Sequence, residues 1–439
     1  MTCHGLQGEG IEGTTFPKLA HLGAAYVANQ LLAFRSKDRP DPAMQVITQG
    51  LTDSEITALA DYISQLPPSS EIPKAQLSEK AIRGEDIAKN GLWDKGIPAC
   101  FACHGPSGFG IGEIFPKITL QDKSYILQQL SDWKKDARKS DRMNLMRTIA
   151  GKLSTEEAEA VSAYLSAPSS QSQTYKTSVV KSFPDGEMGR IIRLGQEIFT
   201  HTQDNAKPYV GNDLQCVNCH LDRGRRPNSS PLGAAYGMYP AFRKKTNRVD
   251  TFQDRIAGCF QYSMNGKAPA TDSEVMTALV TYSYWLAQGV PLGAKIEGQG
   301  YLSLPRPARK PSAVAGRLVF ERSCSLCHGL DGQGQASEGK TVFPPLWGPR
   351  SFNWGAGMHK PDRAAGFIKA NMPLGLANTL SNQEAWDVAV YMNSHERPPD
   401  PRSQDNVPNT KKDFHDSDAC LYGTKVDGHV LGSQVTSSQ

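Results

Sequence analysis

Three short motifs hold two thiols and an imidazole close together in the chain. Each has the pattern Cys-x-x-Cys-His. Their residues are Cys100, Cys103 and His104, then Cys216, Cys219 and His220, then Cys324, Cys327 and His328. In this pattern the two thiols form thioethers to the vinyl groups of haem, and the adjacent histidine ligates the iron. The sequence therefore predicts three sites of covalent haem c.

Zinc binding and disulfide exchange are the other common roles of paired cysteines. A structural zinc site takes four ligands, usually from two Cys-x-x-Cys pairs or from one pair and two spaced histidines. Here each pair has only its own adjacent histidine. A redox-active pair does not require that histidine three times over. Haem attachment is the interpretation that accounts for all three motifs.

A fourth, incomplete motif stands at the start of the sequence, where Cys3 and His4 are followed by Gly5. The residues after it recur in the same order after the motif of Cys100, Cys103 and His104. The recurring pairs are Phe16-Pro17-Lys18 with Phe115-Pro116-Lys117, Tyr26 with Tyr125, and Gln30-Leu31 with Gln129-Leu130. Residues 1–66 and about 80–167 are therefore predicted to be two copies of one unit. We expect the native chain to extend upstream, with one more cysteine and the first helix of this unit.

Methionines at regular positions are the candidate distal iron ligands. Met44 and Met146 each lie eight residues before a predicted helix start, and Met372 lies nine residues before the corresponding one. Thioether ligation opposite histidine is common in cytochromes c. Met143, Met358 and Met392 compete for this role, but Met392 falls inside a predicted helix and is expected in the core.

The third of the four units, which contains Cys216, Cys219 and His220, differs at these positions. A helix predicted over residues 251–264 carries Arg255, Cys259 and Ser263 at i, i+4 and i+8, on one face. Cys259 is one candidate for the distal ligand of the His220 haem, and Met264 is the other. Spacing alone leaves the two nearly equal.

Cations gather in the same unit, on both sides of this helix. They are Arg223, Arg225, Arg226, Arg243, Lys244, Lys245, Arg248 and Arg255. Paired cations near one haem suit a small polyanion. The other interpretation is a solvated basic face that docks a partner protein.

The elements that must position these residues are short helices. Each unit is predicted to end in a helix that opens with a Ser/Thr-x-x-Glu capping box. The pairs are Thr52/Glu55, Ser154/Glu157, Thr271/Glu274 and Ser381/Glu384. Further helices are predicted over 81–89, 190–200 and 314–322, before the complete motifs.

Helix, haem motif, loop and helix is the plan of small all-α cytochromes. We predict an all-α chain of four class I cytochrome c-like domains in two pairs. Their bounds are 1–67, 77–167, 187–290 and 311–402, with a loosely ordered tail over 403–439 that contains the unassigned thiol Cys420. The chain has 439 residues and a net charge of +4, and it has no apolar run long enough for a membrane span. These values disfavour nucleic-acid binding and membrane insertion.

The sequence also resembles two known families. Residues 1–167 resemble dihaem cytochromes of the c4 type, and residues 187–402 resemble thiosulfate dehydrogenase, a dihaem enzyme that forms tetrathionate. The strings that carry the second resemblance are Cys219-His220-Leu221, Gly224-Arg225, Arg255-Ile256-Ala257-Gly258-Cys259, Ser263-Met264-Asn265-Gly266, Phe343-Pro344-Pro345-Leu346-Trp347-Gly348-Pro349, Asn353-Trp354-Gly355-Ala356-Gly357-Met358 and Asn371-Met372-Pro373-Leu374-Gly375. The whole chain resembles a fusion of that enzyme with its electron acceptor.

This resemblance implies specific roles. Cys259 would be the distal ligand of the active-site haem, and Arg255 and Ser263 would line the thiosulfate site. The family has a further arginine upstream of Arg255. In this sequence its role would fall to Lys245 or Arg248. Some family members have a lysine beside this methionine and exchange one iron ligand for the other. Here the neighbour of Met372 is Asn371, so a fixed His328/Met372 ligand pair is implied.

The expected activity is oxidation of thiosulfate to tetrathionate, with reduction of tetrathionate as the reverse. In the hypothesis, the Cys259 sulfur binds the sulfane sulfur of one thiosulfate and a second thiosulfate attacks the adduct. Four haem c groups would carry electrons toward a downstream soluble redox protein. Covalent haem attachment places the protein in the periplasm. The rival hypotheses are a four-haem electron carrier without its own substrate, and a sulfur-oxidation protein that carries a persulfide on the haem-ligating cysteine.

Overall fold

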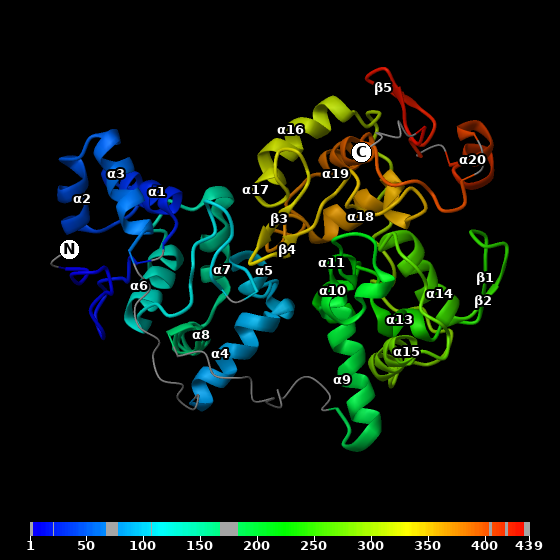
Figure 1. Cartoon of the computed structure of the whole chain (residues 1–439), viewed down its shortest axis with the longest axis horizontal. Helices are drawn as coiled ribbons and strands as arrows, with labels where there is room; N and C mark the ends of the chain where they lie inside the picture. Colours follow the sequence, from blue (N-terminus) through cyan, green and yellow to red (C-terminus); the bar gives the residue numbers. More distant parts are fainter. Residues whose placement is uncertain are drawn as a thin grey trace. The chain divides into compact units, whose positions relative to one another are not determined.

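The computed structural model describes residues 3–20, 22–66, 78–106, 108–166, 183–403, 406–417 and 420–433. The expected domain ends at 67, 77 and 167 lie outside these residues. The chain divides into two compact units, residues 1–182 with 336–342, and residues 183–335 with 343–439. In the described part of the chain, no helix is both long and apolar enough to cross a membrane. Short helices dominate both units, so the predicted all-α class is confirmed (Figure 1).

The first unit contains eight α-helices in its described residues. They are α1 (Ala24–Arg35), α2 (Pro42–Gln49), α3 (Asp53–Ser64), α4 (Glu79–Asn90), α5 (Phe101–His104), α6 (Lys123–Lys134), α7 (Leu145–Lys152) and α8 (Thr155–Ser166). Two 3₁₀ turns, η1 (Trp93–Lys95) and η2 (Arg142–Asn144), precede α5 and α7. Helix α1 packs on α2 and α3, and α4 packs on α8.

The second unit carries the remaining α-helices of the described chain. They are α9 (Gly186–Thr200), α10 (Thr202–Asn205), α11 (Cys216–Cys219), α12 (Leu221–Gly224), α13 (Leu232–Tyr236), α14 (Phe252–Gly258), α15 (Glu274–Ala287), α16 (Ala313–Ser323), α17 (Ser325–His328), α18 (Pro361–Asn371), α19 (Asn382–Asn393) and α20 (Val407–Phe414). Shorter turns are η3 (Lys207–Tyr209), η4 (Cys259–Ser263) and η5 (Gly357–His359). Two of its two-stranded hairpins pair β1 (Ala241–Arg243) with β2 (Arg248–Asp250) and β5 (Lys425–Val426) with β6 (His429–Val430). A third hairpin pairs β3 (Gln335–Ser337) with β4 (Lys340–Phe343), and its residues 336–342 belong to the first unit.

One helix crossing recurs three times and shows the predicted repeat in space. Helices α4 and α8, α9 and α15, and α16 and α19 pack in pairs, and the last pair lies side by side in Figure 1. At each crossing a glycine faces a backbone carbonyl. An added Cβ would lie 1.9 Å from Ala160 O at Gly84, 2.1 Å from Ala278 O at Gly195 and 2.0 Å from Asp387 O at Gly316. Only glycine permits so close an approach of two helices.

The tyrosines of the repeat occupy equivalent places at these crossings. The added Cβ atoms would also lie 3.0 Å from Tyr164 Cβ, 2.7 Å from Tyr282 Cβ and 2.7 Å from Tyr391 Cβ. Tyr282 therefore corresponds to the other two tyrosines, although its spacing from the preceding glutamate differs by one residue.

Three of the four predicted capping boxes are confirmed. Thr52 with Glu55 and Ser381 with Glu384 form reciprocal boxes, and Ser154 and Glu157 exchange the same two hydrogen bonds.

The predicted box of Thr271 with Glu274 is wrong. A turn from Ala270 brings Ser273 directly before α15, and the Ser273 side chain accepts from Met276 N at 3.2 Å. Ser273 is therefore the N-cap, and Thr271 lies too far upstream for that role.

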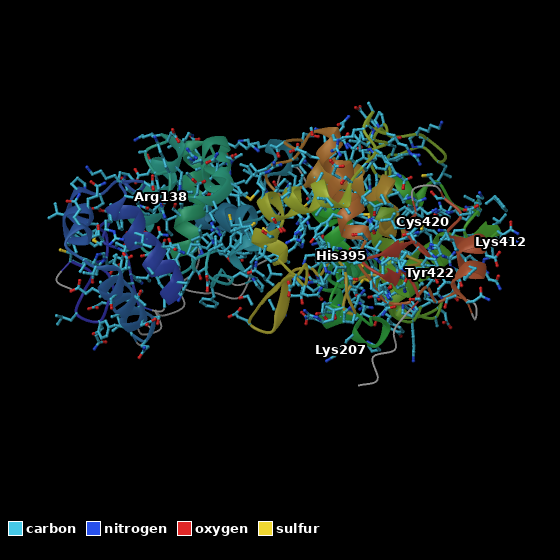
Figure 2. The ribbon with its side chains drawn as sticks, turned by 90° about the horizontal axis from the view of Figure 1, so that it is seen from above. Arg138, Lys207, His395, Lys412, Cys420 and Tyr422 are labelled. Atoms are coloured by element: carbon cyan, nitrogen blue, oxygen red, sulfur yellow. The ribbon has the colours of Figure 1, made fainter. Side chains whose placement is uncertain are left out.

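The expected loosely ordered tail is also wrong for its described residues. Cys420, Tyr422 and Leu431 form a buried cluster with Trp354, whose side chain is fully buried. Cys420 and Tyr422 lie close together in Figure 2. These apolar residues are irregularly spaced, so the sequence shows no periodicity that would have indicated a packed segment.

Candidate functional site

The four motif histidines share one hydrogen-bond arrangement. In each, Nδ1 contacts a backbone carbonyl oxygen: Pro17 for His4 at 3.1 Å, Pro116 for His104 at 2.8 Å, Ser230 for His220 at 2.7 Å and Pro344 for His328 at 2.9 Å. A carbonyl can only accept, so Nδ1 carries the proton and Nε2 keeps its lone pair. This tautomer and orientation suit a histidine that ligates a metal through Nε2.

The motif cysteines lie on the same turns as these histidines. Backbone N–H groups of His104, His220 and His328 donate to the carbonyl of the first cysteine in each motif, at 2.9, 3.1 and 3.0 Å. None of the nine cysteines forms a disulfide. Burial raises the pKa of Cys100 to about 11 and that of Cys216 to about 12. A redox-active cysteine has a lowered pKa, and these thiols do not share that property.

Three buried side chains among the described residues have donors that no protein group accepts. The donors are Nε and Nη1 of Arg397, the indole N–H of Trp133 and the hydroxyl of Ser162. The Arg397 guanidinium lies over the rings of Phe352 and Trp354 and is almost fully buried. An unsatisfied buried donor is costly. The carboxylates of haem propionates have the chemistry to accept from such donors, so the residues present fit haem.

The predicted methionine ligands lie in comparable settings. Met44 stands in α2 against the core of α1 and α3, and Met146 stands in α7 against the core near Leu130. Met372 follows directly after α18. Met392 is buried within α19, as expected for a core residue. The ligand assignments of Met44, Met146 and Met372 stay predictions.

The third motif unit places Arg255 against Cys259. Arg255 Nη1 donates to Cys259 Sγ at 3.0 Å. The Cys259 thiol also hydrogen-bonds the His220 side chain. Because Ser230 occupies His220 Nδ1, Cys259 faces the Nε2 side of that ring.

The helix predicted over residues 251–264 has a different geometry in its second half. Helix α14 ends at Gly258, and Cys259–Ser263 form the π turn η4, closed by a bond from Met264 N to Cys259 O at 2.9 Å. The segment Cys259–Ser263 therefore departs from the regular α-helix that the sequence predicted. Ser263 is half-buried, and its backbone carbonyl accepts from Asn212 Nδ2 at 2.8 Å.

Arg255 and Lys245 favour the charged form of Cys259. Burial opposes that charge, but these two cations, together with the contact with His220, outweigh it and lower the pKa of Cys259 to about 6. The thiolate in turn raises the pKa of Arg255. The pair is therefore a guanidinium and a thiolate at hydrogen-bond distance.

Of the two cations predicted from the β1–β2 hairpin, the structure brings Lys245 toward this pair. Lys245 Nζ donates to Gly355 O at 2.6 Å and lies 3.4 Å from the centre of the Tyr262 ring. Burial, followed by the charges of Arg402 and Arg255, lowers the pKa of Lys245 to about 7. A cation in this setting can bind an anion that enters beside Cys259.

Arg248 has a different setting. It lies 3.0 Å from Asp250 and 2.8 Å from Asp254, and its side chain is 62 % exposed. These carboxylates engage its donors at the surface. The geometry therefore favours Lys245 over Arg248 as the second cation of the site.

Sequence reasoning missed two neighbours of this site. Arg402 pairs with Asp400 at 2.6 Å and lies over the Tyr262 ring. Tyr301 is close enough to Arg255 and Cys259 to interact electrostatically with both, and burial raises its pKa. Neither residue belongs to a motif, so only the tertiary structure identifies them.

Family models match two parts of the chain. The model described as SoxA/TsdA, cytochrome c domain, matches residues 195–292, and the model described as cytochrome c matches residues 1–67 and 313–396.

Individual relatives agree with these matches. Thiosulfate dehydrogenase of Thiomonas intermedia is 53 % identical over 251 residues, which cover 57 % of this chain and 80 % of that protein. The protein named thiosulfate dehydrogenase electron acceptor in the same organism is 38 % identical over 167 residues, or 38 % of this chain and 77 % of that protein.

A solved structure matches almost the whole length. Thiosulfate dehydrogenase (TsdBA) from Marichromatium purpuratum, in its "as isolated" form, is 42 % identical, covers 99 % of this chain and 95 % of its own, and has a TM-score of 0.92. This chain is thus similar to these proteins over most of their lengths. It also contains the motif histidines, the Arg255–Cys259 pair and the recurring helix crossings. This chain belongs to the thiosulfate dehydrogenase family.

Proposed function

We propose that this protein joins two thiosulfates into tetrathionate, 2 S₂O₃²⁻ → S₄O₆²⁻ + 2 e⁻, and passes the electrons to its cytochrome-like N-terminal part. The observation that carries this proposal is the half-buried Arg255–Cys259 pair, which faces the metal-binding nitrogen of His220. The relatives named as thiosulfate dehydrogenase, and the relative named as its electron acceptor, support it.

Four haem c groups would serve this reaction. Cys3, Cys100, Cys103, Cys216, Cys219, Cys324 and Cys327 would attach them, and His4, His104, His220 and His328 would ligate their irons. Met44, Met146, Cys259 and Met372 would be the distal ligands. Haem c, when bound, supplies one-electron acceptors for the electrons that thiosulfate releases.

The chain's own cations would bind the substrate. Thiosulfate is a dianion, and bringing two dianions together is opposed by their mutual repulsion. Arg255 offers a planar fork of donors, and Lys245 offers a compact charge. Placed beside Cys259, they can offset this repulsion as the two thiosulfates meet.

Cys259 would also form the covalent intermediate. Its thiolate and the sulfane sulfur of the first thiosulfate form an S–S bond, Cys–S⁻ + S–SO₃²⁻ → Cys–S–S–SO₃⁻ + 2 e⁻. The second thiosulfate then attacks the sulfane sulfur, forms tetrathionate and releases the Cys259 thiolate. Arg255, at 3.0 Å, stabilises the thiolate both as nucleophile and as leaving group.

Substitution of Cys259 tests the catalytic assignment. We expect Cys259→Ala to keep all haem, measured by its pyridine haemochrome spectrum, and to lose tetrathionate formation. Met264→Leu is the matched control for the other candidate ligand, and it should keep both the activity and the low-spin thiolate signal in electron paramagnetic resonance. Persistent activity in Cys259→Ala would show that the assignment is wrong.

Two assays separate this function from its rivals. The protein should oxidise thiosulfate with ferricyanide and reduce tetrathionate with a reduced viologen. An electron carrier without its own substrate would do neither faster than free haem. A persulfide carrier would retain a sulfur adduct on Cys259, detectable by mass spectrometry, without forming tetrathionate. We place the protein in the periplasm, where haem c is attached, with a small soluble redox protein as the final acceptor.

A further inference from the structure

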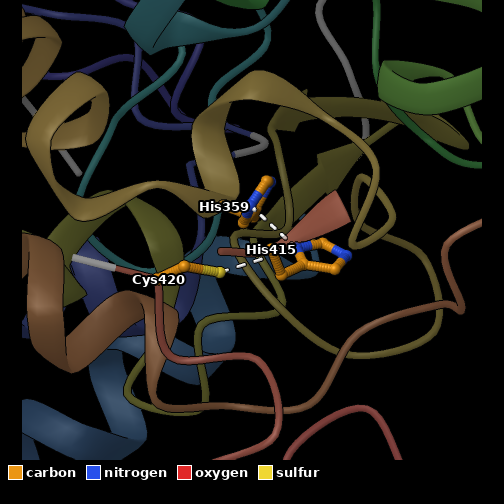
Figure 3. Close-up of side chains that lie close together, drawn as sticks. All are labelled: His359, His415 and Cys420. Carbon is orange, nitrogen blue, oxygen red and sulfur yellow. Dashed lines mark hydrogen bonds between the residues drawn. The ribbon is translucent and has the colours of Figure 1, made fainter. Parts of the chain in front are cut away.

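A second group of metal-ligating side chains lies apart from the motif histidines and Cys259. His359 ends η5, His415 follows α20, and Cys420 stands in the C-terminal segment that was expected to be a loose tail. Their side chains point toward one another in Figure 3. His359 is 3 % exposed, His415 0 % and Cys420 5 %. One potential ligand atom from each lies within 4.8 Å of the other two.

The hydrogen bonds around these rings determine which nitrogens carry protons. His359 Nδ1 contacts the carbonyl of Ala356, which can only accept, so that nitrogen carries the hydrogen. His415 Nε2 lies 3.1 Å from Asp400 Oδ2, and Arg402 pairs with the same carboxylate. The ionised carboxylate accepts, so Nε2 of His415 carries the hydrogen. His359 Nε2 and His415 Nδ1 therefore both hold lone pairs.

These two lone pairs face each other. The nitrogens are 3.2 Å apart, and Cys420 Sγ lies 3.5 Å from His415 Nδ1. Two acceptors at this distance repel unless a positive species lies between them. A metal ion would take up both nitrogens and the sulfur.

The surroundings have the features of a metal-binding site. Each imidazole is held through its remote nitrogen, one by a carbonyl and the other by a carboxylate, as in histidines that ligate metals. The Tyr422 ring stacks on His415 at 4.1 Å, and Trp354 lies edge-on to His359. These aromatic rings limit the access of water. Asp400 and the Cys420 thiolate supply negative charge to balance a cation.

We propose that His359 Nε2, His415 Nδ1 and Cys420 Sγ bind one thiophilic metal ion, Cu⁺ or Zn²⁺, that fastens the C-terminal segment to the region of Trp354. Two imidazoles and a thiolate suit both ions. Three ligands complete a trigonal Cu⁺ site, whereas Zn²⁺ would need a water as the fourth ligand. Binding releases the thiol proton of Cys420. This proposal does not depend on the proposed enzyme activity.

Elemental analysis of the full-length haem protein tests the proposal. We expect one copper or zinc atom per chain beyond the haem iron, either as purified or after anaerobic addition of Cu⁺ or Zn²⁺ followed by gel filtration. X-ray absorption at the copper or zinc edge should show nitrogen and sulfur neighbours, with the sulfur at about 2.3 Å for zinc. The edge that responds distinguishes the two ions.

Variants localise the metal. Cys420→Ala should lose the additional metal and keep its haem. His429→Ala is the matched control, because His429 lies in the same C-terminal segment but contacts Glu396 instead of the cluster. It should keep the metal.

If Cys420→Ala does not fold, a chelator is added to the unsubstituted protein, and this experiment takes the place of the variant. Chelation should lower the unfolding temperature without removing the covalently held haem. A protein that binds neither ion, or a Cys420→Ala or chelated protein that is unchanged in metal content, would overturn the proposal.

Discussion

Arg255 provides the sharpest test of the proposed active site. Its Nη1 donates to Cys259 Sγ at 3.0 Å, and the thiolate raises its pKa in return. Arg255→Ala removes this bond and the positive charge, and Arg255→Lys keeps a charge but loses the planar fork. We expect both variants to lose activity, the alanine variant more than the lysine variant.

The size of the loss follows from the type of bond. A hydrogen bond to a charged partner contributes about 1.5–3 kcal/mol. If this contribution acts in the transition state, kcat/KM for thiosulfate falls about 10- to 150-fold in Arg255→Ala, since each ~1.36 kcal/mol corresponds to a factor of ten. A rise in KM would show that Arg255 binds the dianion, and a fall in kcat would show that it stabilises Cys259 as the bond forms or breaks.

The assay is steady-state ferricyanide reduction with thiosulfate as the varied substrate. Arg190→Ala is the matched control, because Arg190 lies in α9 of the same unit and pairs with Glu187 and Glu274 at the surface. Exposed pairs contribute little, so this variant should stay within about twofold of the unsubstituted protein. Equal kcat/KM values in Arg255→Ala and Arg190→Ala would refute the assignment of Arg255.

Two further predictions concern the site's charge and the helix crossings. Because the pKa of Lys245 is lowered to about 7, Lys245 loses its charge as the pH rises through 7, and kcat/KM should fall above that pH. Lys245→Arg should flatten this pH profile, and an unchanged profile would contradict the role of Lys245. Gly316→Ala should lower the free energy of unfolding by about 1–3 kcal/mol, because its Cβ would meet Asp387 O at 2.0 Å. Gly151→Ala, at an open helical position, should be neutral or stabilising in the same denaturation experiment, and equal stability of the two variants would contradict the close crossing.

The haem motifs and the helical repeat could be predicted from the sequence because both depend on local spacing. Thioether formation requires two cysteines and a histidine on one turn, so the motif itself carries the chemistry. The helices before the complete motifs were predicted for the same kind of reason. Helix α9, for example, shows its apolar periodicity within a single stretch.

The remaining features depend on tertiary contacts. The π turn at Cys259 cannot be told from an α-helix by residue spacing, so the backbone geometry of Cys259–Ser263 was not predicted. Cys420 follows His415 by five residues, but this spacing matches no known motif and gave no reason to pair them. His359 lies in a separate segment, and the fold alone brings the two together. The position of Lys245 against Gly355 likewise joins segments that no motif connects.

The proposed chemical specialisation of the third motif unit centres on the segment that carries Arg255 and Cys259. Gly195 and Tyr282 hold α9 on α15 as Gly84 and Tyr164 hold α4 on α8, so the scaffold that presents the motif histidine is unchanged. In the second repeat unit, helix α7 carries the candidate ligand Met146. The third repeat unit has α14 and the π turn η4 at the corresponding position. In our proposal, a scaffold that keeps its helix crossing exchanges an electron-transfer centre for a catalytic one mainly through this segment, with Lys245 supplied by the β1–β2 hairpin. In the third unit, that segment brings Arg255 and Cys259 together at hydrogen-bond distance.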